Sequence, residues 1–147
     1  MSGYISWENF LFEIKNFQAA SSSLRDGWEL RVLKDEPQHT FLAKRVIKMI
    51  EQTPAHATTN IHEGSQEENV LASDASNRLV TFEYHVIYSI SYSVPVLYFT
   101  AWRQDGTPLS LEEVWDQVPR CYQEQLKQQR WSILTQQQLP LIMVEYR

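Results

Sequence analysis

The segment from Tyr84 to Val118 constrains the fold of this chain more than any other part of the sequence. It holds two runs rich in apolar and aromatic residues, which a short serine-rich turn joins at Ser89 to Ser93. An Asp-Gly turn at residues 105–106 and the start of a helix follow at once. Because the turn between the two runs is short, the segment predicts two neighbouring antiparallel strands and then a helix.

The first predicted strand, Leu79 to Ser89, alternates between two kinds of side chain. One side consists of Val80, Phe82, Tyr84, Val86 and Tyr88, and the other has Thr81, Glu83 and His85. A period of two indicates a strand with one buried face, which places Phe82 in the core.

The second predicted strand, Val94 to Trp102, is apolar on both sides. This pattern indicates a more central strand, with Leu97 buried. Pro95 has no N–H to donate, so it belongs at the start of the strand.

The helix after these strands has a clear start. Ser110 and Glu113 have the spacing of a capping box, and Leu109 and Val114 have that of a hydrophobic staple. Pro119 then breaks this helix and opens the next. The inward stripe of the first helix is predicted to be Val114, Trp115 and Val118.

The first 50 residues predict a helix, a strand and one ambiguous segment. Apolar residues at helical spacing predict a helix from about Ser6 to Ala20, with Ser6 as its N-cap. Its polar face carries more acidic than basic charge, which disfavours a membrane-surface helix. Alternation predicts a strand over Trp28 to Val32, and Lys34 to His39 is a turn. Thr40 to Ile50 fits a helix or a strand.

Composition indicates one small globular domain that is expected to be cytoplasmic. The 147 residues are 43% apolar and 12% aromatic, which argues against global disorder. No apolar run reaches the ~20 residues of a membrane helix, and no signal peptide is visible. The single cysteine excludes an internal disulfide and fits a reducing compartment.

The net charge of −5 comes from one segment, residues 51–77, which has five acidic residues and no Lys or Arg. The remainder is balanced, so the sequence gives little support for nucleic-acid binding. The segment is also rich in small polar residues, and we interpret it as a flexible acidic insert between two strands.

Few residues could carry chemistry. Cys121 lies in the first turn of a predicted helix, where a thiol pKa is lowered, but a semi-buried packing role beside Val118 is the stronger interpretation. His56, His62 and Glu63 fit no common metal-ligand spacing. His85 could act as a general base, although an exposed or hydrogen-bonded strand histidine is the better interpretation.

Several short segments stand in order along the second half of the chain: Glu83-Tyr84-His85, Val94 to Phe99, Asp105-Gly106-x-Pro108-Leu109, Trp115 and Thr135-Gln136-Gln137. In this order they resemble the autophagy-related protein ten family of ubiquitin-like conjugating enzymes. The resemblance is strong from about Phe82 to Gln137 and weaker through Trp28 to Arg31 and the first helix.

The resemblance implies a single α+β domain over residues 1–147 that is similar to ubiquitin-conjugating enzymes. An N-terminal helix would pack on a mostly antiparallel sheet of about four strands, short helices would follow, and 51–77 would be a flexible insert. The resemblance also favours a strand over Thr40 to Ile50.

The resemblance also implies acyl transfer without a cofactor or a metal. In the family, the cysteine of a His-Pro-Cys motif takes the modifier, autophagy-related protein twelve, as a thioester from the activating enzyme, autophagy-related protein seven. A lysine of autophagy-related protein five then attacks. Exposed sheet and hairpin surfaces would bind these partners. The family's cysteine comparable to Cys121 is not the catalytic one.

The sequence departs from the family pattern after Gln138. Leu139-Pro140 stands where the family usually has His-Pro, and residues 141–147 contain no cysteine. So abrupt a divergence indicates an alternative exon, a shifted gene model or a truncated product. Two hypotheses follow: an active acyltransferase that uses Cys121 or a longer product, and a non-catalytic form that docks the conjugation partners. The missing motif favours the second.

Overall fold

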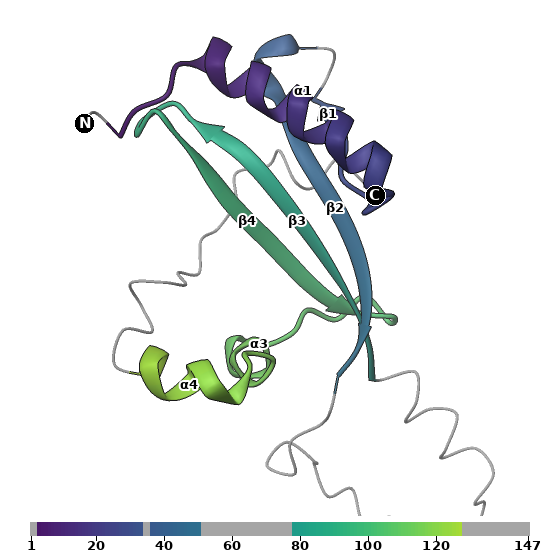
Figure 1. Cartoon of the computed structure of the whole chain (residues 1–147). Coiled ribbons are helices and arrows are strands. Elements are labelled where there is room, and N and C mark those ends of the chain that lie inside the picture. Colours follow the sequence, from purple (N-terminus) through teal and green to yellow (C-terminus); the bar gives the residue numbers. More distant parts are fainter. Residues whose placement is uncertain (1–2, 34–35, 51–77, 128–147) are drawn as a thin grey trace, which may run out of the picture.

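Four antiparallel strands form one sheet in chain order: β1 (Glu29–Val32), β2 (Thr40–Met49), β3 (Leu79–Ser89) and β4 (Val94–Arg103) (Figure 1). The structure is a computed structural model that describes residues 3–33, 36–50 and 78–127. Helix α1 (Trp7–Leu24) lies across one end of the sheet, and the short helices α3 (Leu111–Asp116) and α4 (Arg120–Lys127) lie at the other end (Figure 1). The predicted α+β architecture is confirmed.

Helix α1 starts where its sequence predicts and ends later. The Ser6 hydroxyl accepts a hydrogen bond from the Asn9 amide at 3.1 Å, which confirms the N-cap. The helix continues to Leu24, four residues beyond the predicted end. Ser21 explains the extension, because it is buried, bonds to the Asp26 carboxylate and accepts a hydrogen bond from the Trp28 amide at 3.2 Å.

The ambiguous segment is a strand, as the resemblance favoured. β2 pairs with β1 at its start and with β3 along most of its length, from Leu42 opposite Val86 to Met49 opposite Leu79. A short 3-10 helix, Pro37–His39, precedes it within the predicted turn. Residues 34–35 of that turn lie outside the described part of the chain.

Two apolar clusters lie on the same side of the sheet, at its opposite ends. Phe10 and Ile14 of α1 pack on Leu42 of β2, with Val86 and Tyr88 of β3 beside them. The second cluster consists of Ile50, Val80 and Phe82, with Tyr84, Phe99, Ala101 and Leu109 packed against it. The predicted burial of Phe82 is therefore confirmed.

The start of the chain is tied to the β3–β4 hairpin. The Ile5 amide donates to the Ser93 carbonyl at 2.8 Å, and the Tyr88 hydroxyl donates to the Ile5 carbonyl at 2.9 Å. The rings of Trp7 and Phe10 pack against Tyr88, with centroid separations of 5.7 and 5.4 Å. These contacts fix where α1 enters the fold relative to the hairpin.

The predicted cap of α3 is present in full. The Ser110 hydroxyl accepts from the Glu113 amide at 3.2 Å, and the Ser110 amide donates to the Glu113 carboxylate at 2.7 Å. α4 begins directly after Pro119, which confirms the predicted break. The predicted inward residues Val114, Trp115 and Val118 are half-buried.

Two expectations about the sheet are wrong. β4 was predicted to be central, but it is the outermost strand of the sheet that the described residues form, and Leu97 on it is 60% exposed. A strand that is apolar on both sides is buried on both faces only where other parts of the protein cover both faces, and the sequence pattern does not show that cover. The polar side of β3 was expected to face water, yet Glu83 and His85 are buried.

The acidic insert, residues 51–77, lies outside the described part of the chain. Within the described part, no helix has the length and apolar character required to cross a membrane.

Candidate functional site

The single cysteine is exposed. Cys121 lies in the first turn of α4, directly after Arg120. The predicted semi-buried position beside Val118 is therefore wrong. Among the described residues, no hydrogen bond or ion pair reaches the thiol, whereas an enzymatic thiol nucleophile is usually activated by a nearby base or cation.

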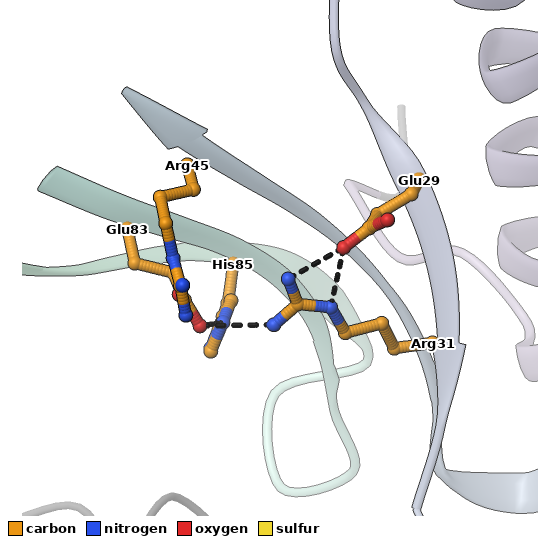
Figure 2. A network of polar contacts seen from close by, with 5 residues as sticks. All are labelled: Glu29, Arg31, Arg45, Glu83 and His85. Atoms are coloured by element: carbon orange, nitrogen blue, oxygen red, sulfur yellow. Dashed lines mark hydrogen bonds and ion pairs between the residues drawn. The ribbon is translucent and has the colours of Figure 1, made fainter. Parts of the chain in front are cut away.

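The polar side of β3 forms a connected network, which Figure 2 shows. At its centre is the carboxylate of Glu83, on the face of the sheet opposite α1. Because alternate residues of a strand share a face, Glu83 and His85 lie together, and the register places Arg45 of β2 directly opposite Glu83.

Three side chains donate to this one carboxylate. Arg31 Nη1 lies 2.9 Å from Oε1, and Arg45 Nη2 lies 2.7 Å from Oε2. His85 Nε2 is 2.8 Å from Oε1 (Figure 2). Arg31 also binds the Glu29 carboxylate through Nε at 2.7 Å. The network therefore joins three strands, β1, β2 and β3.

Exposure differs among these groups. The side chain of Arg31 is 19% exposed, whereas that of Arg45 is 54% exposed, and its guanidinium lies 5.8 Å from the ring centroid of Trp102. Arg31 is therefore the inner partner of Glu83, and Arg45 is the partner nearer to solvent.

The surroundings shift two pKa values. Burial of Glu83 favours the neutral acid, but the hydrogen bonds from Arg45 and His85 and the charge of Arg31 outweigh it, so the pKa of Glu83 lies below its ordinary value. For His85, burial outweighs the attraction of Glu83 and lowers the pKa. The network at neutral pH therefore combines a charged carboxylate with a neutral imidazole.

His85 does not have the geometry of a general base. Its side chain is 2% exposed, its Nε2 is occupied by Glu83, and the ring of Phe41 lies 5.0 Å away, centroid to centroid. The prediction of an exposed or hydrogen-bonded strand histidine is confirmed through its second alternative, because His85 is hydrogen-bonded and buried. The network links three strands of the sheet, and the burial of His85 does not suit it to a reaction with an external substrate.

Sequence reasoning found Glu83 and His85 but missed their partners, Arg31 and Arg45. Alternation along each strand could have assigned the two arginines to a face: Arg31 shares the face of Glu29 on β1, and Arg45 shares the face of Ala43 on β2. Only the pairing register brings these residues to Glu83, and that register follows from the tertiary fold.

His56, His62 and Glu63 lie outside the described part of the chain. Within the described part, no group of three or more potential metal ligands is present.

The hairpin tip is an apolar surface on a fixed support. Ile90 and Tyr92 are both exposed there, and the bond from Ile5 to Ser93 holds the turn against the start of the chain. Tyr4, next to Ile5, is also exposed. A turn that presents exposed apolar side chains is suited to docking a protein partner.

Comparison with known proteins identifies the family to which the sequence is similar. Residues 9–146 match the family described as autophagocytosis associated protein, active-site domain. The chain belongs to this family. The match includes every strand of the described sheet and both short helices after it.

Curated relatives of this family member are ubiquitin-like-conjugating enzymes. Human ATG10 is 45% identical over 73 residues, which cover 50% of this chain and 33% of the relative. ATG10 of Arabidopsis thaliana is 26% identical over 155 residues, which cover 88% of this chain and 69% of the relative. ATG10 of Dictyostelium discoideum is 34% identical over 65 residues, which cover 44% and 28%. In the first of these matches, the chain spans a third of the relative's length.

Proposed function

We propose that this chain is a conjugating-enzyme domain of autophagy that serves the transfer of the ubiquitin-like modifier autophagy-related protein twelve to a lysine of autophagy-related protein five. The family match over residues 9–146 carries the proposal. The arrangement of α1 on a four-stranded antiparallel sheet supports it, because this is the fold that the resemblance implies.

The proposed chemistry is acyl transfer through a cysteine thioester. A thiolate suits both halves of this reaction, because it is a good nucleophile and a good leaving group near neutral pH. The activating enzyme, autophagy-related protein seven, would deliver the modifier, and the domain would hold the thioester and the attacking lysine in reactive geometry.

Within these 147 residues, the proposed role is to dock partners. The sequence has no His-Pro-Cys motif, and its single cysteine is Cys121. That thiol is exposed, and no hydrogen bond or ion pair of the described residues reaches it. The hairpin tip, with the exposed side chains of Ile90 and Tyr92, supplies a surface for binding without catalysis.

A charging reaction separates the docking role from catalysis by Cys121. The chain is incubated with activating enzyme, modifier and ATP, and the products are run on a non-reducing gel beside a Cys121→Ser variant. We expect no reductant-sensitive adduct on either protein. An adduct on the unmodified chain that disappears in the variant would make Cys121 the nucleophile and refute the docking role as the whole function.

A binding measurement tests the docking surface. The double variant Ile90→Ser/Tyr92→Ser should weaken binding to the activating enzyme or to the acceptor by about tenfold, because the anchors of an interface carry most of its binding energy. Phe12→Ser is the matched control, since Phe12 is an exposed aromatic residue that lies on α1 and not on the hairpin. Equal losses in both variants would show that the hairpin tip is not the docking surface.

A further inference from the structure

We propose that the outer edge of β4, between Pro95 and Ala101, binds an extended, uncharged segment of a partner polypeptide, which adds to the sheet as a strand. The inference concerns the sheet edge alone and does not depend on the conjugation reaction. It rests on the direction of the backbone groups, the ends of the edge and the absence of charge along it.

The register of the sheet determines which backbone groups point outwards. β3 and β4 pair without interruption from Val80 opposite Arg103 to Ser89 opposite Val94. On the outer side, the Arg103 amide donates to the Thr107 carbonyl at 2.8 Å, and the Ala101 carbonyl accepts from the Leu109 amide at 3.0 Å. In an antiparallel strand, successive residues point their N–H and C=O groups to opposite sides.

The odd-numbered residues of β4 therefore direct their backbone groups outwards. Leu97 and Phe99 each present one N–H and one C=O at the outer edge, whereas Tyr98 and Thr100 bond to β3. Among the described residues, no strand pairs with β4 from Pro95 to Thr100 on this side. Such an edge is a template for strand addition.

Both ends of this edge are closed, which limits the length of the added segment. At one end, Thr107 to Leu109 already pairs with the strand through the bridge between Trp102 and Pro108. At the other end, Pro95 has no N–H to donate. The interval between these ends accommodates roughly five residues of an extended chain.

The chemistry of the edge selects an uncharged occupant. From Val86 to Trp102 the sequence contains no Asp, Glu, Lys or Arg. Proteins commonly protect exposed edges with charged residues, and this edge lacks that protection. The exposed side chain of Leu97 would pack against an apolar residue of the added strand, whereas a charged residue there would have no counter-charge on β4 between Val94 and Trp102.

Amide hydrogen exchange, measured residue by residue by NMR on the full chain, tests the proposal within a single strand. The probe is an uncharged heptapeptide of alternating valine and threonine, with blocked ends. Free chain should show faster exchange at Leu97 and Phe99 than at Tyr98 and Thr100. Saturating peptide should slow exchange at Leu97 and Phe99 by about tenfold or more, because exchange then requires the added strand to open.

Two results would overturn the proposal. Equal protection of Leu97 and Tyr98 in the free chain would mean that the edge is already paired. If that protection increased with protein concentration, the occupant would be a second copy of the chain. If it did not change with concentration, the occupant would be another segment of the same chain. Unchanged exchange at saturating peptide would show that the edge takes no strand.

Substitutions at Leu97 separate the outward amide from the side chain. Leu97→Pro removes an outward N–H donor without removing a bond to β3. It should weaken binding of the fluorescently labelled peptide by about tenfold, because one hydrogen bond to the added strand is lost and the proline ring blocks the edge. Leu97→Ala keeps the donor and should retain most of the affinity. If thermal melts show that Leu97→Pro is unfolded, Leu97→Lys takes its place with the same expected loss. Equal affinity of the blocking variant and Leu97→Ala would contradict the proposal.

Discussion

Glu83 and Glu113 each use a carboxylate to hold other parts of the molecule together, in two different regions. Only the contacts of Glu113 with Ser110 could be predicted from the sequence. Glu113 accepts from the Ser110 amide three residues away and pairs with Arg103 ten residues away. Glu83 accepts from Arg45 and Arg31, which are 38 and 52 residues away. The first carboxylate completes a helix start, and the second joins three strands.

The difference teaches when a polar residue can be understood from its neighbours. Helical geometry fixes the distance between residues three apart, so the Ser-x-x-Glu spacing alone predicts the contact at Ser110. No local rule brings β1 and β2 to Glu83, because that contact needs the finished register. Alternation separates the two faces of β3, but it does not show that both faces are buried.

Removing the charge of Glu83 should have the largest effect. Glu83→Gln leaves the inner arginine, Arg31, without one of its carboxylate partners. We expect a loss of about 2 kcal/mol of unfolding free energy, below the ~3–5 kcal/mol for one partner of a fully buried pair, because Arg45 is half-exposed. Urea denaturation measures it. Glu13→Gln, at an exposed position on α1, is the control. Equal small changes in both variants would mean that the network contributes little.

Acidification should weaken the same region without any substitution. The folded pKa of Glu83 lies below its ordinary value of 4.5, so its contribution is present above that pH and is lost as the pH falls towards the folded pKa. The folded pKa of His85 lies below 6.5, so the unfolded chain binds that proton first and stability begins to fall below pH 6.5.

Both shifts therefore lower stability in acid, and the change is measured by urea denaturation at about pH 7 and about pH 4. Glu83→Gln should show a smaller fall than the unmodified chain. An unchanged fall would mean that other groups cause the acid sensitivity.

The local region should respond more weakly. Ser110→Ala removes the side-chain acceptor at the start of α3 and should cost about 1 kcal/mol. Ser110→Asp keeps an acceptor and should cost less, and denaturant melts compare the two. A loss in Ser110→Ala larger than that in Glu83→Gln would reverse the order of the two regions.

The smallest effect is expected at Glu113 itself. Glu113→Gln keeps an acceptor for the Ser110 amide, because glutamine also serves in a capping box. It removes only the ion pair with Arg103, which is partly exposed, so we expect about 0.5 kcal/mol. If Glu113→Gln proves as costly as Ser110→Ala in the same melts, the ion pair with Arg103 matters more than the cap.

Elements with local signals were predicted well from the sequence. The N-cap at Ser6, the capping box at Ser110 and the break at Pro119 are all present, because each depends on residues within one helical turn. The place of β4 in the sheet was predicted wrongly, because an apolar strand can lie at an edge. The exposure of Cys121 was missed because helical spacing does not show what covers a helix.

The bond between Tyr88 and Ile5 spans 83 positions, so it also sets an order of events during synthesis. α1 leaves the ribosome well before the strand that anchors its start has been made. Its Phe10 and Ile14 can meet Leu42 on β2 first, and Tyr88 arrives only with the hairpin. The residues before α1 are thus translated early and secured late, and a nascent chain that stops short of the hairpin lacks the anchor for the start of this helix.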